Sequence, residues 1–206
     1  MAKSDKYFDP RKPGWMNDDE LAVIRAAVSN ASDVLEVGCY CGRTTLALLE
    51  GSKGLVVAID PLHRNGWMPS WPEPACDGLY LDSHRHMAKL VAEYPQRLVV
   101  FPVFSAEVFT LFRRKVDALV IDADHSYQST KNEIDAFAPL VPFGGVIVLD
   151  DFDMEPVSSA WRDSEYRRVR PWLVPEVTQS IAVVRVVQEP PQLPPEVLAT
   201  PAPEAQ

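Results

Sequence analysis

The chain has 206 residues and a formal net charge of −9, with 47% hydrophobic and 24% charged residues. These values are typical of one globular domain with a sizeable core. The acidic excess disfavours nucleic acid as a main partner, because it repels the phosphate backbone. The polar first residues are unlike a signal peptide, and no apolar run approaches the roughly 20 residues that cross a bilayer. The composition therefore predicts a cytoplasmic protein without a membrane partner.

The chain divides into three parts by composition. Residues 1–30 hold a polar and aromatic arm, followed by a helix that Asn17 or Asp18 caps. Residues 31–188 alternate apolar runs with helical patterns, which indicates a single domain. Residues 189–206 are rich in Pro, Glu and Ala without a hydrophobic period, so we expect a disordered tail there.

Apolar runs and helical patterns alternate regularly through the predicted domain. In chain order they predict a strand at 34–37, a helix at 44–50, a strand at 55–60, a helix at 79–94, a strand at 98–101, a helix at 106–112, a strand at 117–122, a helix at 129–140, a strand at 146–150, a helix at 157–170 and a strand at 180–187. Nearly continuous Val, Ile and Leu strands between helices are typical of a parallel sheet that is covered on both faces.

A glycine-containing turn follows the first predicted strand. Gly38 allows a sharp turn off the strand, and Gly42 allows the backbone to approach a ligand at the start of the next helix. Tyr40 stands where a dinucleotide-binding turn needs its second glycine to clear a pyrophosphate. The turn therefore disfavours NAD and FAD and suits a cofactor without phosphates.

Two carboxylates accompany this turn. Glu36 lies two residues before Gly38, where it suits an ammonium group, directly or through water. Asp60 ends the second strand, the place expected for an acid that accepts both ribose hydroxyls. The alternative is that Glu36 is a hydrogen-bonded acid at the strand end and that Asp60 caps a helix.

Several motifs carry a resemblance to known enzymes. Residues 35–38, 42–45 and 59–60 resemble motifs I and II of class I S-adenosylmethionine-dependent methyltransferases. The later motifs are Val-Ile-Asp-Ala-Asp-His-Ser-Tyr at 120–127 and Gly-Gly-Val-Ile-Val-Leu-Asp-Asp at 144–151. They are similar to the methyltransferase 24 group, which includes sugar O-methyltransferases of macrolide pathways, and more distantly to catechol O-methyltransferase. The resemblance covers about residues 31–152 and implies an α/β fold: a Rossmann-like, doubly wound, mostly parallel sheet of about seven strands with helices on both faces.

The resemblance also implies a cofactor and a reaction. S-adenosylmethionine would donate a methyl group to a hydroxyl of a small-molecule acceptor. The family contacts adenine at the positions of Ser105 and Ala106, often through the backbone. The residues implied to contact the cofactor are Glu36, Gly38, Cys39, Tyr40, Gly42, Thr44, Asp60, Ser105, Ala106 and Asp122.

Three acids are expected at the ends of neighbouring strands. Asp122 ends the fourth strand and Asp150 the fifth, with Asp151 next to it. Strands about 4.8 Å apart let such side chains converge on one ion, and oxygen ligands suit Mg²⁺. The resemblance implies a divalent metal at these three positions that two vicinal oxygens of the acceptor chelate, although catechol O-methyltransferase has asparagine at the position of Asp151. The alternative is that all three are solvated carboxylates.

His125 follows Asp122 by three residues, and we predict these two as catalytic residues. An imidazole with an ordinary pKa near 6.5 suits a general base that takes the proton of a hydroxyl. In the resembled sugar methyltransferases the matching histidine has this role. The alternative is that His125 only caps the following helix. Asp124 and Tyr127 are weaker candidates for contacts with the acceptor.

The sequence leaves several alternatives open. The chain could be a noncatalytic S-adenosylmethionine-binding or assembly protein, or a relative of the cephalosporin hydroxylase type that transfers no methyl group. Cys39, Cys41 and Cys76 lack metal-ligand spacing, so we expect them to pack rather than to bind zinc or to act in redox chemistry. The irregular stretch from Pro61 to Asp77 is expected to form an acceptor lid or a contact in a homo-oligomer.

Overall fold

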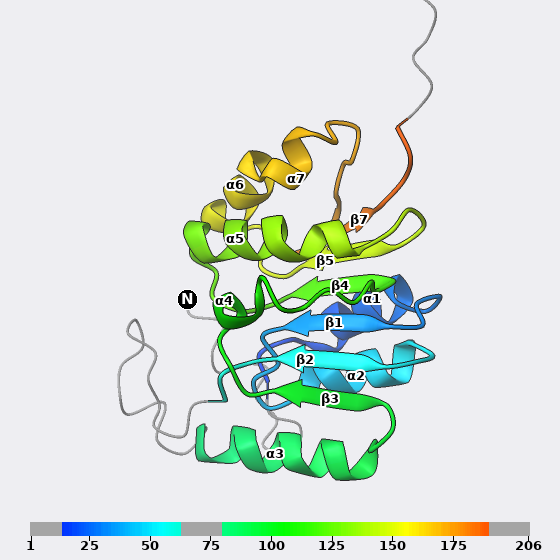
Figure 1. Cartoon of the computed structure of the whole chain (residues 1–206), viewed down its shortest axis with the longest axis vertical. Coiled ribbons are helices and arrows are strands. Elements are labelled where there is room, and N and C mark those ends of the chain that lie inside the picture. Colours follow the sequence, from blue (N-terminus) through cyan, green and yellow to red (C-terminus); the bar gives the residue numbers. More distant parts are fainter. Residues whose placement is uncertain (1–13, 63–79, 190–206) are drawn as a thin grey trace, which may run out of the picture.

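The fold is built on one seven-stranded sheet (Figure 1). The structure, a computed structural model, describes residues 14–62 and 80–189. The strands follow the order β3-β2-β1-β4-β5-β7-β6. Their bounds are β1 Val34–Val37, β2 Val56–Ile59, β3 Leu98–Phe101, β4 Ala118–Ile121, β5 Val146–Leu149, β6 Glu176–Thr178 and β7 Ile181–Arg185.

The first five strands are parallel, and the last two are antiparallel. β7 pairs antiparallel with β5, and β6 forms a hairpin with β7 at the edge of the sheet. Strand order reverses between β1 and β4, where an open α/β sheet has its ligand crevice at the carboxyl ends of the strands. The predicted mostly parallel, Rossmann-like sheet is therefore confirmed.

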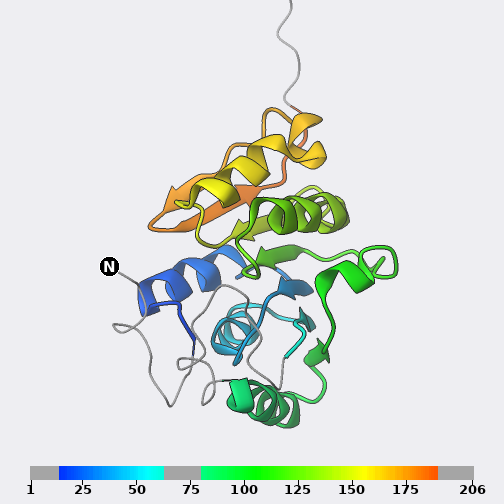
Figure 2. The same ribbon diagram turned by 90° about the vertical axis from the view of Figure 1, so that its left-hand side faces the viewer.

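Helices cover both faces of the sheet (Figures 1 and 2). The helices are α1 Asp18–Ala27, α2 Arg43–Gly51, α3 Tyr80–Glu93, α4 Ser105–Val108, α5 Tyr127–Phe137, α6 Glu155–Asp163 and α7 Glu165–Arg168, with a 3₁₀ turn at Ala138–Leu140. α1, α2 and α3 pack on one face in a core that includes Ile24, Leu48 and Met87. α5, α6 and α7 pack on the other face, around Phe137 and Trp161.

The register places the site, because the central strands end level with one another. Val37 pairs with Ile59 on one side and with Ile121 on the other, and Ile121 pairs with Leu149. The residues that follow these four strands therefore emerge side by side at one edge of the sheet.

The helical region after β5 differs from the prediction. We expected one helix over 157–170, but Ser164 separates α6 from α7. Its buried hydroxyl donates to the carbonyl of Trp161 (2.9 Å) and accepts from the amide of Arg167 (3.1 Å). A serine that bonds to nearby backbone in this way competes with helix continuation, so it ends one helix and begins the next.

Other differences are small. β6 was not predicted, because its three residues are all exposed and show no buried run. α4 is shorter than expected, and α5 begins two residues earlier than expected. The predicted tail, the first 13 residues of the arm and most of the stretch from Pro61 to Asp77 lie outside the described residues. Among the helices within the described ranges, none has both the length and the apolar character needed to cross a membrane.

Candidate functional site

The turn after β1 is packed directly against the end of β4. Gly38 has a φ of +86°, and a Cβ added to it would lie 2.0 Å from the backbone oxygen of Asp122. The amide of Asp122 donates to the carbonyl of Val37 at 2.8 Å. Only glycine allows this approach, so the predicted need for glycine at position 38 is confirmed, and its cause is the neighbouring strand.

The second glycine of the turn makes room for a helix. Gly42 begins α2 with a φ of +84°, and an added Cβ would lie 2.4 Å from the Leu90 side chain and 2.8 Å from the sulfur of Met87, both in α3. We expected it to make room for a ligand. A contact of its backbone with the cofactor therefore stays a prediction.

Between the glycines, the backbone and the thiols are fixed by packing. Tyr40 has a φ of +44°, which is rare for a residue with a side chain. Cys39 and Cys41 are buried and unbridged, and burial raises the pKa of the Cys39 thiol well above its usual range. A protonated, inaccessible thiol suits packing, as we predicted, and is unsuited to redox chemistry.

Asp60 holds this turn in place. One oxygen of its carboxylate accepts from the amides of Cys39 and Tyr40, both at 2.9 Å, and the other accepts from the amide of Leu62 at 2.8 Å. A carboxylate has roughly four acceptor positions, so three are filled. The predicted bonds to both ribose hydroxyls would therefore require one of the amides to move away from Asp60.

Glu36 is fully buried beneath the turn. One oxygen accepts from the hydroxyl of Thr45 at 2.6 Å, while the other has no hydrogen-bond partner among the described residues. Burial raises the pKa of Glu36 to about 8, partly offset by the Thr45 bond. A cationic amino group near the unpaired oxygen would satisfy it and favour the charged carboxylate, which is the chemistry predicted for this position.

The acids at the ends of β4 and β5 converge with His125. Donor atoms of Asp122, His125 and Asp150 all lie within 4.8 Å of one another. The Nε2 atom of His125 is 4.0 Å from an oxygen of Asp122 and 3.6 Å from one of Asp151. The structure therefore adds His125 to the predicted cluster of three acids, with Asp151 facing the histidine.

The charge of this cluster calls for a cation or for protons. Burial, and next the neighbouring acids, raises the pKa of Asp122, and the same two causes raise the pKa of Asp150 to about 7. One oxygen of Asp150 is buried without a hydrogen-bond partner among the described residues. An unpaired, buried carboxylate oxygen beside other carboxylates fits a hard divalent cation. The imidazole of His125 would also suit a transition metal.

The other polar residues of the loop after β4 form hydrogen bonds within the protein. Ser126, rather than His125, caps α5, so the alternative role of His125 as a helix cap is wrong. The carboxylate of Asp124 accepts from the amide (3.1 Å) and hydroxyl (2.9 Å) of Ser126. The hydroxyl of Tyr127 donates to Asp163 at 3.1 Å. Asp124 and Tyr127 thus support the loop and α6, and their contact with an acceptor stays a prediction.

Sequence reasoning missed the partner of Ser105. The Ser105 hydroxyl, at the start of α4, donates to Glu133 of α5 at 2.7 Å, and Glu133 is 1% exposed. Burial raises the pKa of Glu133 to about 7. The signal was present in the sequence, because Glu133 shares the inward face of the predicted helix with Thr130 and Phe137. Ala106, next to Ser105, is exposed, and Thr44 at the start of α2 is buried.

Known proteins share this fold and part of this sequence. A family model described as a methyltransferase domain matches residues 35–152. The O-methyltransferase NovP is 16% identical with a TM-score of 0.60, over 85% of this chain and 82% of NovP. An O-methyltransferase from Bacillus cereus in complex with SAH is 17% identical with a TM-score of 0.57, over 82% of each chain. TomG from Streptomyces achromogenes, an O-methyltransferase in complex with SAM, is 15% identical with a TM-score of 0.55, over 84% of this chain and 82% of TomG.

Proposed function

The chain belongs to the methyltransferase domain family and has the fold of class I S-adenosylmethionine-dependent methyltransferases, and from this we propose that it is an O-methyltransferase acting on a hydroxyl of a small molecule. S-adenosylmethionine, when bound, supplies a methyl group that its sulfonium has already activated. The protein's own contribution is then to align donor and acceptor and to keep water away.

The donor site would lie over the turn Gly38–Gly42. Glu36 would receive the amino group of the methionine part, because its unpaired oxygen lies buried beside the turn. Asp60 would accept from the ribose, and Ser105 and Ala106 would border the adenine at the start of α4. Cys39, Tyr40 and Thr44 would contact the cofactor from the turn itself and from the start of α2.

The observation that carries the proposal is the contact between Gly38 and Asp122. This contact joins the turn that would hold the donor to the strand end that would hold the acceptor, with no side chain between them. A methyl group bound over the turn would therefore lie next to the acids and to His125. Direct transfer between two bound molecules requires this proximity.

The acceptor site would be the cluster of acids and His125. Asp122, Asp150 and Asp151 would hold a divalent cation, Mg²⁺ by our prediction. Such a cation, when bound, supplies positive charge that favours the deprotonated form of an acceptor oxygen. His125 would take the proton from the acceptor hydroxyl as the oxygen bonds to the methyl group and the bond from sulfur to that carbon breaks.

Calorimetric titration with S-adenosylhomocysteine, with and without Mg²⁺, tests this proposal on the wild type and on Asp150→Ala. We expect wild-type affinity near micromolar, about −8 kcal/mol. The Asp150→Ala variant should retain most of this affinity, and adding Mg²⁺ should no longer change it. No binding by the wild type would contradict the proposal. Binding without any effect of Mg²⁺ on affinity or turnover would instead favour a noncatalytic binding protein.

A further inference from the structure

The residues before α1 and the first turn of that helix lie between the start of α2 and the turn that joins β6 to β7. We call Trp15–Glu20 the N-terminal strap. It contains the cap of α1, where Asn17 accepts from the amides of Asp19 and Glu20, and the carboxylate of Glu20 accepts from the amide of Asn17 at 2.8 Å. These reciprocal bonds form a capping box, which fixes the backbone of the strap where it enters α1.

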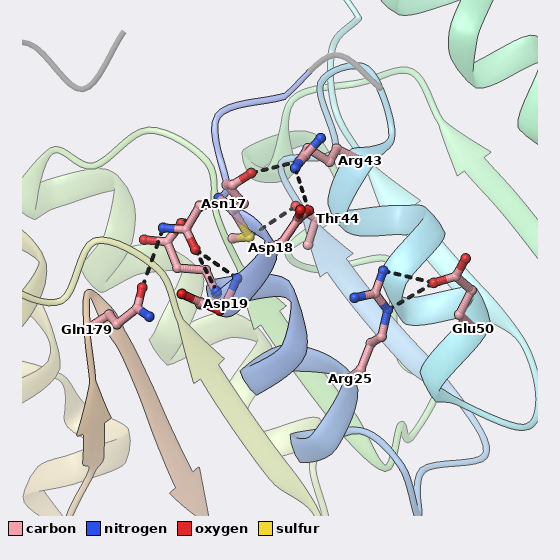
Figure 3. Close-up of polar contacts among 10 residues, drawn as sticks. Asn17, Asp18, Asp19, Arg25, Arg43, Thr44, Glu50 and Gln179 are labelled. Carbon is pink, nitrogen blue, oxygen red and sulfur yellow. Dashed lines mark hydrogen bonds and ion pairs between the residues drawn. The ribbon is translucent and has the colours of Figure 1, made fainter. Parts of the chain in front are cut away.

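One end of the strap is fastened to the start of α2. The Nε of Arg43 donates to the carbonyl of Met16 at 2.7 Å, and its NH2 group donates to the carboxylate of Asp18 at 3.0 Å (Figure 3). The side chain of Arg43 is 9% exposed and its bond to the Met16 carbonyl is partly buried, whereas the Asp18 carboxylate is 94% exposed, so the Met16 bond is the one sheltered from water. The chain also passes close over this side chain, since a Cβ added to Gly14 would lie 2.5 Å from the Cβ of Arg43.

The strap also touches the cofactor turn itself. The ring of Trp15 stacks on the ring of Tyr40, with 6.5 Å between centroids and 26° between planes. The hydroxyl of Thr44 contacts the sulfur of Met16 at 3.4 Å, and Met16 is buried in the core. The strap therefore supports the turn at Tyr40, whose backbone conformation is rare, as well as the helix that follows.

The other end of the strap is fastened beside the acid cluster. The buried hydroxyl of Ser180 donates to Glu20 at 2.7 Å. The amide side chain of Asn17 donates to Gln179 at 3.4 Å (Figure 3). The carbonyl of Ser180 in turn accepts from the amide of Phe152 at 2.7 Å. Phe152 directly follows Asp151, so this chain of bonds leads from the strap to the acids.

We propose that the N-terminal strap is a positioning element that holds the cofactor turn and the acid cluster in register, with Arg43 and Ser180 as the positioning residues at its two ends. The inference rests on the proposed function for its effect on ligands. Its structural part, that the strap restrains the turn, stands without it. The two parts are therefore measured separately.

Arg43→Met tests the first end, because it keeps an apolar stem of similar length and removes the donors. In the unliganded protein, amide hydrogen exchange at Cys39 and Tyr40 should accelerate about tenfold or more, and S-adenosylhomocysteine should bind about tenfold or more weakly. The matched control is Arg25→Met, since Arg25 also joins α1 to α2, through Glu50 at 2.9 Å, but away from the turn (Figure 3). It should change neither value.

Ser180→Ala tests the second end. Amide exchange at Phe152 should accelerate, and Mn²⁺ alone, followed by electron paramagnetic resonance, should bind several-fold more weakly, while S-adenosylhomocysteine affinity is retained. The control is Ser29→Ala, which removes an exposed hydroxyl bonded only within its own helix end. Wild type that binds no Mn²⁺ would contradict the proposed metal site and leave the exchange result to decide the restraint.

Several outcomes would overturn the inference. Equal exchange and equal affinity in Arg43→Met and Arg25→Met would show that the strap does not restrain the turn. If Arg43→Met does not fold, Trp15→Ala removes the ring that stacks on Tyr40 and should give the same pattern in a weaker form. Wild type that fails to bind S-adenosylhomocysteine would refute the proposed function, whereas the exchange rates would still decide whether the strap positions the turn.

Discussion

Gly38 and Gly144 share a left-handed backbone conformation but differ in their surroundings. Their φ angles are +86° and +89°. An added Cβ meets the backbone oxygen of Asp122 at Gly38, whereas no atom lies within 4 Å at Gly144. The two positions therefore separate conformational strain from a steric clash.

Alanine substitutions at these two glycines should differ in the free energy of unfolding. Gly144→Ala should lower it by about 1 kcal/mol, the strain of a left-handed residue with a side chain. Gly38→Ala should lower it by about 4 kcal/mol or more, because β1 and β4 must separate. Urea unfolding followed by circular dichroism measures both. Similar losses in the two variants would contradict the proposed close contact.

Glu36 should make stability depend on pH. Its pKa is raised to about 8 in the folded protein, so the fold favours the protonated form. The stability of the unliganded protein is then highest below the unfolded pKa, near 4.5, and falls as pH rises through 8.

Glu36→Gln tests this pH dependence. Relative to the wild type, the variant should gain stability between pH 5 and pH 8.5 by a few kcal/mol, since one pKa unit corresponds to about 1.4 kcal/mol. Urea unfolding at several pH values gives this difference. Glu50→Gln, at an exposed position on the same helix as Thr45, should show no such gain. A constant difference between wild type and Glu36→Gln would show that the carboxyl stays charged.

At the level of elements, the break at Ser164 is set by one side chain. Ser164→Ala removes the hydroxyl that caps α7 and should lower the free energy of unfolding by about 1 kcal/mol. Ser164→Asp restores an acceptor for the amide of Arg167, although the buried charge limits the recovery. Ser158→Ala, which removes a hydroxyl bonded only to its own helix backbone, is the control. Equal losses at the two serines would contradict the capping role.

The parallel strands and most of the helices could be predicted because their signals are local. The five parallel strands lie where continuous Val, Ile and Leu runs predict them, and Asp122 and Asp150 meet because the register of parallel strands brings their ends level. The inward position of Glu133 could be predicted from its helix face, but the bonding partners of Glu133, Arg43 and Ser180 could not, since they lie 28, 27 and 160 residues away in the chain. Local patterns do not determine such pairs.

At the level of the whole molecule, ligand binding should stabilise the fold by mass action. At a concentration of S-adenosylhomocysteine about 100 times its Kd, the gain is about 2.7 kcal/mol, or roughly 5–10 °C in melting temperature for a chain of this size. Differential scanning fluorimetry measures the shift. NAD should give none, because Tyr40 stands where a dinucleotide-binding turn needs a glycine to clear the pyrophosphate. A shift with NAD alone would reverse our assignment of the cofactor.

The contact of Gly38 with Asp122 also limits how this enzyme could be redesigned. In the proposed function the donor and the acceptor bind on either side of this contact, and because backbone meets backbone there, no exchange of side chains would widen their spacing. A library aimed at larger or differently shaped alcohols should leave the strand ends unchanged and vary the segments around them, such as the turn after β5 at Phe152 and Met154.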